Sequence, residues 1–245
     1  MKAKKNRRLV VWVAALSAVV TLGRVDAAEA DGWWKNFEIG TRSTYFWIRD
    51  DKRGATQLPG NAGNYYGSIN ELVEVEDPWP LKIFVDYKIN PYWGVELTWD
   101  QIKAKTYTQV DPTSGWGGYS DGTLSLIGPE ASVFARYPND TIFTPYAGVG
   151  AVYYFASNTE NGDWAHPYGD FYQAFDPNNT WGWVFYGGCA IQLSGPWSAD
   201  LFVRYTKVDV DGTHYQGFGA ADSIGGQFTF PLSNVSAGLG VRYSF

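Results

Sequence analysis

The last eleven residues of the chain alternate between apolar and polar side chains without interruption. The apolar side chains are those of Val235, Ala237, Leu239, Val241, Tyr243 and Phe245. A period of two places these side chains on one face of a β-strand and the intervening Ser, Gly and Arg residues on the other. A tilted strand needs about 9–11 residues to cross a bilayer. The pattern therefore predicts a membrane-crossing strand at residues 235–245.

Seven earlier segments show the same alternation and are also predicted to be strands. They are residues 34–48, 82–90, 93–103, 124–137, 142–155, 181–193 and 197–208. In the third of these, Val95 and Leu97 alternate with Glu96 and Thr98. The segment 142–155 is ambiguous because both of its faces are apolar or glycine, so its outward face is assigned by analogy with its neighbours.

The connections between these strands alternate strictly between short and long. The three short connections carry a proline, at Pro91, Pro138 and Pro196, and the four long ones span roughly residues 49–81, 104–123, 156–180 and 209–232. This order is typical of an outer-membrane barrel with short periplasmic turns and long extracellular loops. We predict an all-β fold, an eight-stranded antiparallel transmembrane β-barrel. The alternative, a soluble barrel of the lipocalin kind, is disfavoured because its aliphatic faces would point into water.

Aromatic residues gather at both ends of the predicted strands. Those at the short-turn ends are Trp93, Tyr137, Phe143, Trp197, Tyr243 and Phe245. Those toward the long loops are Trp47, Trp99, Tyr153, Trp181 and Tyr205. Two such belts match the aromatic girdles at the two membrane interfaces.

The first thirty residues have the pattern of a secretory signal peptide. A basic start is followed by an apolar run at residues 9–22, which is too short to span a membrane, and by the cleavage pattern Ala28-Glu29-Ala30. We predict a signal peptide at residues 1–30 and a barrel domain at residues 31–245. Removing six Lys/Arg and two Asp/Glu changes the formal net charge from −6 to −10. An acidic mature chain disfavours nucleic acid as a partner.

Cysteine and histidine are scarce. Cys189 is the single cysteine, so an internal disulfide is excluded, and only His166 and His214 accompany it. We predict no metal site, no cofactor and no catalytic residue.

The predicted register turns charged side chains into the lumen. The predicted polar lumen network consists of Glu38, Arg42, Asp86, Lys88, Glu96, Asp100, Glu130, Arg136, Asp200, Arg204 and Arg242, to which Lys82 adds a further inward charge. With Lys82, six acids face six bases. Charges removed from water must pair, whereas an ion channel more often carries a ring of one sign. We predict that these side chains pair and close the lower half of the barrel.

Inward positions nearer the long loops are apolar instead. The predicted apolar upper lumen consists of Phe46, Ile48, Phe84, Ile102, Leu124, Leu126, Val152, Tyr154, Val184 and Val208. Ligand pockets are mostly apolar, so one interpretation is a chamber for a small hydrophobic molecule. The other is that these side chains only pack against one another and the loops.

Several motifs in the second half of the chain are distinctive through their order and spacing. They are Gly128-Pro129-Glu130-Ala131, residues 144–151, Thr180-Trp181-Gly182, residues 197–201, Asp209-Val210-Asp211 and residues 238–245. Together they resemble the OmpW family of small outer-membrane proteins. The resemblance implies an eight-stranded barrel whose hydrophobic lumen passes small apolar compounds. It also implies a place near the lumenal constriction for Trp181, although the alternation points this residue outward. The N-terminal part departs from the family, so a more distant OmpA-like or OmpX-like barrel stays open.

The C-terminal Phe245, two residues after Tyr243, resembles the insertion signal of outer-membrane barrels. It implies the barrel-assembly machinery as a partner and an outer membrane of the Gram-negative type as the location. Outer-membrane lipid and lipopolysaccharide are then expected around the barrel, and a small hydrophobic ligand is the further expected partner.

Two functional hypotheses follow. The first is a barrel that binds or passively passes small hydrophobic molecules, and the second is a structural or adhesive barrel with a sealed lumen and interacting loops. A lipid A-modifying enzyme built on His166 or His214 with Ser223 is a weaker third, because a triad is defined by geometry. The acidic loops 156–180 and 209–232 could attract divalent cations, but loop solubility is the favoured explanation.

Overall fold

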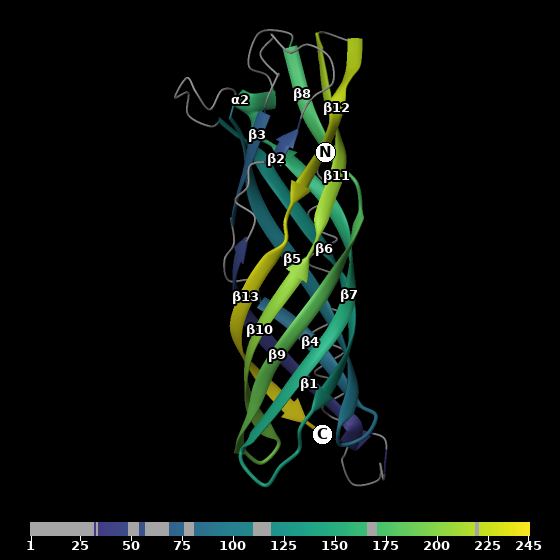
Figure 1. Cartoon of the computed structure of the whole chain (residues 1–245), viewed down its shortest axis with the longest axis vertical. Helices are drawn as coiled ribbons and strands as arrows, with labels where there is room; N and C mark the ends of the chain where they lie inside the picture. Colours follow the sequence, from purple (N-terminus) through teal and green to yellow (C-terminus); the bar gives the residue numbers. More distant parts are fainter. Residues whose placement is uncertain are drawn as a thin grey trace, which may run out of the picture. The chain divides into compact units, whose positions relative to one another are not determined.

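Eight strands close into an antiparallel barrel in the computed structural model (Figure 1). They are β1 (Phe37–Ile48), β4 (Leu81–Lys88), β5 (Trp93–Gln109), β6 (Tyr119–Arg136), β7 (Phe143–Glu160), β9 (Thr180–Ser194), β10 (Trp197–Lys207) and β13 (Asn234–Ser244). Their order around the wall is β5-β4-β1-β13-β10-β9-β7-β6, and pairing of β6 with β5 completes the ring. Each predicted strand overlaps one of the eight, so the predicted fold class is confirmed.

The structure describes residues 32, 34–48, 54–56, 69–75, 81–109, 119–165, 171–218 and 221–245. The barrel belongs to the unit Asn36–Phe245, and a single 3-10 turn, η1 (Trp34–Asn36), precedes β1 in sequence. The predicted signal peptide and its cleavage residues Ala28 and Ala30 lie outside the described residues. Across the described ranges, no helix is long and apolar enough to cross a membrane.

Burial along the strands follows the period of two that the sequence predicts. On β10, Asp200, Phe202 and Arg204 are buried in the lumen, whereas Leu201 and Val203 are exposed on the outside. On β7, where the pattern was ambiguous, Val152 is buried and Val149 is exposed, which confirms the assignment by analogy. The first and last strands pair from Glu38–Ser244 to Ile48–Asn234, so the wall has no open edge between the two ends of the barrel chain.

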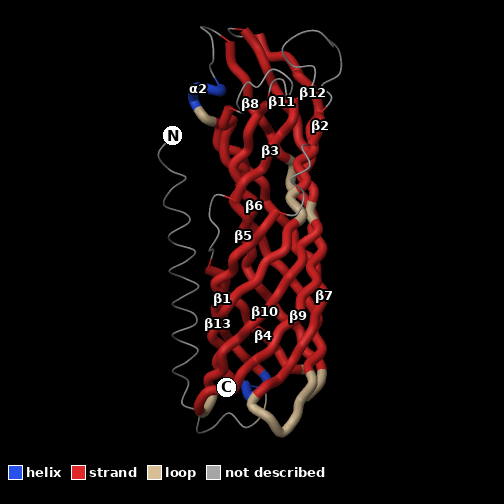
Figure 2. The backbone as a smooth tube through the Cα atoms, turned by 60° about the vertical axis from the view of Figure 1, so that its left-hand side comes forward, coloured by secondary structure: helices blue, strands red, loops and turns tan. Residues whose placement is uncertain are grey.

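The long connections contain strands that the alternation did not predict. They are β2 (Gly54–Thr56), β3 (Ile69–Val75), β8 (Phe171–Pro177), β11 (Asp209–Phe218) and β12 (Ala221–Pro231), together with the short helix α2 (Gly162–Ala165). β3 pairs with the far end of β5, and β8, β11 and β12 form a separate three-stranded sheet. In Figure 2 these strands continue the barrel at the end opposite the C-terminus. The long extracellular connections therefore contain regular structure: β3 pairs with β5, β8 pairs with β11, and β11 and β12 form a hairpin.

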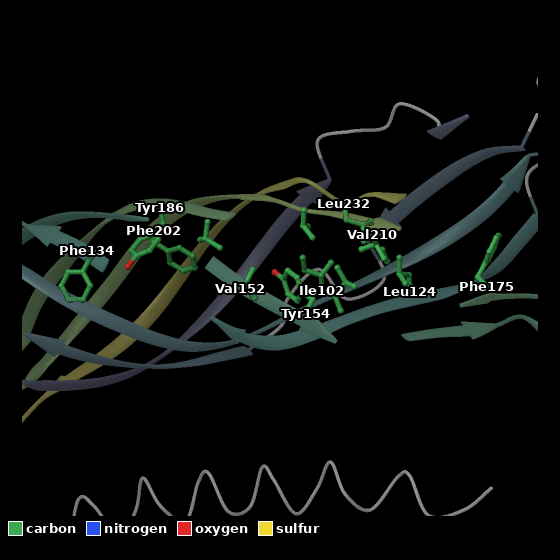
Figure 3. Close-up of a cluster of buried hydrophobic side chains, with 14 of the residues drawn as sticks. Ile102, Leu124, Phe134, Val152, Tyr154, Phe175, Tyr186, Phe202, Val210 and Leu232 are labelled. Atoms are coloured by element: carbon green, nitrogen blue, oxygen red, sulfur yellow. The ribbon is translucent and has the colours of Figure 1, made fainter. Parts of the chain in front are cut away.

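A continuous cluster of apolar side chains runs through the loop end of the barrel (Figure 3). We call its main part the apolar column. The apolar column consists of Ile102, Ala104, Leu124, Leu126, Val152, Tyr154, Val184, Val208, Val210 and Leu232. Figure 3 shows Phe134, Tyr186 and Phe202 on one side of Val152 and Tyr154, and Phe175 at the other end. The column therefore joins the barrel to the three-stranded sheet.

Candidate functional site in the lumen

Arg42 is the centre of one group of buried ion pairs. Its guanidinium donates two parallel hydrogen bonds to Glu96, at 2.7 and 2.8 Å, and a third of 2.6 Å from Nε to Asp200. The hydroxyl of Tyr146 donates to the other oxygen of Asp200 at 2.7 Å. A bidentate arginine–carboxylate pair is among the strongest side-chain hydrogen-bond arrangements, so this group fixes β1 to β5 and β10 across the lumen.

Arg242 and Glu38 form a second group next to the short turns. Arg242 donates to Glu38 and to Asp86, each at 2.7 Å. Glu38 also accepts a hydrogen bond of 2.9 Å from Arg136 and lies 3.3 Å from the ammonium of Lys88. One carboxylate thus meets three cations that come from β13, β6 and β4, which closes the lumen at this end.

A third group lies at the boundary with the apolar column. The guanidinium of Arg204 donates to Asp100 at 2.6 Å and lies 2.8 Å from Glu130. Asp100 also pairs with Lys82 and accepts a hydrogen bond from the hydroxyl of Tyr154. The ring of Tyr154 belongs to the apolar column, and its hydroxyl contacts Asp100 in the polar group below. Tyr154 therefore lies at the boundary between the two parts of the lumen.

The structure brings together all eleven residues of the predicted polar network and Lys82, the further inward charge that the register predicts. Six carboxylates and six cations meet, as the register predicts. Desolvation of each charge is costly, and only close pairing with good hydrogen bonds compensates it. Each of these side chains has at least one ion-pair partner, although Oδ1 of Asp86 and Nε of Arg242 are buried without a hydrogen bond. Together they fill the lower lumen with a plug of six acidic and six basic groups.

Phe84 corrects one detail of the predicted apolar chamber. It is buried in the lumen, but its ring lies 3.9 Å from the guanidinium carbon of Arg42 and 5.1 Å from that of Arg242. The ring therefore belongs to the polar layer, where it contributes cation–π contacts. Gly40 makes room for it, because a Cβ on Gly40 would lie 2.3 Å from the ring.

Seven other predicted chamber residues are buried where the apolar column runs. Their side chains are between 0% and 3% exposed, and they are Ile102, Leu124, Leu126, Val152, Tyr154, Val184 and Val208. Phe46 and Ile48 lie on β1, but their side chains are outside the described ones. The sequence interpretation missed Val210, Leu232 and Phe175, which lie in the segments taken as loops. The sequence carries no clear signal for β11, because its inward positions Val210, Gly212 and His214 do not form an apolar face.

The wall beside the apolar column contains a break in its hydrogen-bond ladder. The pairing of β6 with β7 reaches Ile127–Phe155 and resumes at Glu130–Val152, so Gly128 and Pro129 carry no assigned pair on that side. Proline has no N–H to donate and is found in sheets mainly at edges or bulges. A Cβ on Gly128 would lie 1.7 Å from the carbonyl oxygen of Tyr153, so only glycine permits this close approach.

Trp181 lies on the outer face of the barrel. Its side chain is 66% exposed, and its ring packs against that of Tyr153 with 4.9 Å between the centroids. The alternation predicts this orientation, and the constriction role implied by the resemblance does not apply. Gly182 faces inward, and a Cβ there would lie 3.0 Å from Val152.

Of the residues considered for a catalytic site, the described side chains include only His214. His166 and the side chain of Ser223 lie outside them. His214 is buried on β11 beside the ring of Phe175, at 5.1 Å between centroids. Burial lowers the pKa of His214 to about 4, so the imidazole is neutral at physiological pH.

The C-terminal residues lie at the short-turn end of the barrel. The backbone N–H of Phe245 donates to the carbonyl of Phe37 at 3.2 Å, and its ring packs edge to face against Tyr243. Tyr243 in turn packs against Trp197. These aromatic side chains contribute to the belt predicted for this end, while their role as an insertion signal stays a prediction.

A closed barrel with an apolar outer face, two aromatic belts and an ion-paired polar lumen is the architecture of a small outer-membrane β-barrel protein. The family model for the outer membrane protein β-barrel domain matches residues 13–245, and the chain belongs to that family. The chain is therefore an outer-membrane protein, as predicted.

Solved structures show the same fold. The crystal structure of OprG from Pseudomonas aeruginosa has a TM-score of 0.68 at 16% identity, over 87% of this chain and 98% of OprG. The solid-state NMR structure of AlkL in DMPC bilayers has a TM-score of 0.59 at 17% identity, over 89% of this chain and 94% of AlkL. The expected fold of a small outer-membrane barrel is thus confirmed, and the family shown is that of the outer membrane protein β-barrel domain. No curated protein matches the sequence.

Proposed function

We propose that this barrel takes up small hydrophobic molecules from outside and releases them sideways into the membrane. The molecule enters the apolar column from the extracellular sheet and leaves between β6 and β7, at Gly128 and Pro129. The observation that carries the proposal is the ladder break beside the column. Two column residues lie beside the break: Leu126 is two residues before Gly128 on β6, and Val152 on β7 pairs with Glu130 where the ladder resumes.

The polar plug is the reason for a sideways exit. A molecule that continued toward the periplasm would have to separate Arg204 from Asp100 and then Arg42 from Glu96, whose hydrogen bonds measure 2.6 to 2.8 Å. Breaking one buried ion pair leaves an uncompensated charge and costs about 3–5 kcal/mol. An apolar solute offers nothing to offset this cost, whereas the bilayer beside Pro129 is a favourable solvent for it.

Passage requires the column to open transiently. Its side chains are packed, with Val152 and Val184 fully buried, so the solute has to displace them as it moves. Replacing one apolar contact by another is nearly neutral in free energy, which is why small, flexible hydrocarbons suit this route better than polar or bulky solutes. Opening of the ladder at Pro129 needs fewer hydrogen bonds to break than at any regularly paired part of the same two strands.

The proposal is tested by uptake of an apolar fluorescent probe into outer-membrane vesicles that contain the protein and lipopolysaccharide. Pro129→Ala restores an N–H to the ladder and is expected to lower saturable uptake several-fold. Pro145→Ala is the matched control, because Pro145 is also a strand proline but lies near the short turns, paired with Cys189. Equal uptake by Pro129→Ala and the wild type would contradict the proposed exit.

The second candidate function is a sealed barrel whose extracellular sheet interacts with other molecules. It is favoured by the dense packing of the apolar column and the polar plug. If wild-type vesicles show no saturable uptake and the refolded protein binds no apolar probe, the sealed barrel becomes the one candidate function that the results support. In either case we propose outer-membrane lipid and lipopolysaccharide as the surroundings and the barrel-assembly machinery as the partner in insertion, and we propose no catalytic activity.

A further inference from the structure

We propose that a groove on the outer face of the barrel holds one acyl chain of a membrane lipid. The groove has a volume of about 710 Å³ and lies over β9, β10, β13 and β1. Leu201, Val203 and Leu239 line it, and all three point away from the lumen. We call it the lipid-facing groove. It is separate from the apolar column and does not depend on the proposed uptake.

Glycines at one height create the hollow. Gly187 faces outward and leaves the surface of β9 without a side chain. Gly188 and Gly238 face inward, where a Cβ would lie 2.5 Å from the ring of Tyr146 and 2.7 Å from the ring of Phe202, respectively. These lumenal rings therefore lie directly against the wall, and no side chain covers the wall's outer surface at Gly187.

The hollow continues along the strands. A second hollow of about 420 Å³ shares Gly187 and Val203 with the first and reaches Tyr205 and Val235. From Leu201 to Tyr205 the two together follow β10 over about 13 Å, at roughly 3.3 Å per residue. An apolar hollow that is extended along a strand fits a hydrocarbon chain better than a compact ligand.

The height of the groove identifies what surrounds it. On β10 it lies between Trp197, in the belt near the short turns, and Tyr205, in the belt toward the loops. Such belts mark the two membrane interfaces, so the groove faces the hydrocarbon region. The available occupants are therefore a lipid acyl chain or a second copy of the protein.

A second copy fits the groove poorly. Ten residues line it, whereas a stable protein interface involves about 20–30 residues on each side. In a two-fold dimer each subunit presents the same surface, so the grooves of the two subunits would face each other. The empty space between them would leave the lining side chains without van der Waals contacts. A flexible acyl chain fills such a hollow without this loss.

The test compares lipid retention by native mass spectrometry after extraction from phosphatidylethanolamine/phosphatidylglycerol vesicles into a mild detergent. Gly187→Leu fills the groove, and its Cβ would meet only the carbonyl oxygen of Tyr146 at 3.6 Å, an ordinary contact. Val149→Leu is the control, because Val149 is exposed on the outside of β7 and lines neither hollow. We expect about one retained phospholipid in the wild type and in Val149→Leu, and a several-fold loss in Gly187→Leu.

Equal retention in the wild type and Gly187→Leu, or none in the wild type, would overturn the proposal. A dimer that only Gly187→Leu dissociates would assign the groove to a second copy instead. If Gly187→Leu does not fold, the test is instead the rate at which a membrane-permeant maleimide alkylates the cysteine in the groove. Cys189, which lines the groove, should react several-fold more slowly than a cysteine in Val149→Cys/Cys189→Ala, and equal rates would overturn the proposal.

Discussion

Replacing Arg42 by methionine tests whether the polar plug stabilises the barrel as its geometry implies. Arg42 donates three hydrogen bonds of 2.6 to 2.8 Å, to Glu96 and Asp200, and both carboxylates are buried. Removing one partner of a buried pair costs about 3–5 kcal/mol. Asp200 keeps Arg242 and Tyr146 as hydrogen-bond partners, whereas Glu96 loses its bidentate cationic partner and keeps the neutral hydroxyl of Thr98. Most of the loss therefore comes from Glu96.

The measurement is urea unfolding of the refolded protein in lipid vesicles, followed by tryptophan fluorescence. Lys207→Met is the control, because Lys207 pairs with Asp209 at 2.8 Å on the exposed surface, with side chains 50% and 43% exposed, and an exposed pair contributes about 0–1 kcal/mol. The double variant Arg42→Met/Glu96→Met should recover part of the lost free energy of unfolding, because it also removes the buried carboxylate that Arg42→Met leaves without its cation. A loss for Arg42→Met no larger than for Lys207→Met would refute the reasoning.

Two further predictions concern the apolar column and the extracellular sheet. Leu126→Ala should lower the free energy of unfolding by about 2–5 kcal/mol because it creates a cavity in the column. Leu239→Ala, on the exposed outer face, should lower it clearly less. Similar losses for the two variants in the same urea titration would contradict the packing described. Burial lowers the pKa of His214 to about 4. The free energy of unfolding of the sheet around β11 should therefore be at its full value above pH 6.5 and fall as the pH drops toward 4, because in this range the unfolded chain binds a proton that the folded chain does not. Limited proteolysis across this range checks it, and a His214→Leu variant with the same pH dependence as the wild type would rule out the histidine as its source.

The alternation of side chains predicts the strands and their faces because it reports a local property of the backbone. Val149 and Trp181 face outward, and Asp200 and Arg204 face the lumen, as the period of two requires. The pairing of Arg42 with Glu96 is not predicted by it, since β1 and β5 are not adjacent in the wall. Their contact depends on both side chains reaching across the lumen.

The alternation along one strand does not determine how high a residue lies in the barrel relative to residues of other strands. Its position along its own strand predicts Phe84 in the upper chamber, but the stagger between β1 and β4 puts it opposite Gly40 and next to Arg42. Similarly, β11 pairs with β8, whose residues lie more than thirty positions earlier in the chain, as in the pair Gly212–Pro177. Neither pairing leaves a signal within a single segment.

The most direct test of sideways release is a reversible covalent staple across the ladder break. Ile127 and Phe155 face each other immediately above it, and the Cα separation of about 4.5–5.5 Å in facing antiparallel residues suits a disulfide. Ile127→Cys/Phe155→Cys/Cys189→Ser should show low uptake of the apolar probe when oxidised and wild-type uptake after reduction. The same staple at Ala135 and Ala147, lower on the same strands, should leave uptake unchanged. Undiminished uptake through the oxidised Ile127–Phe155 staple would contradict release between β6 and β7.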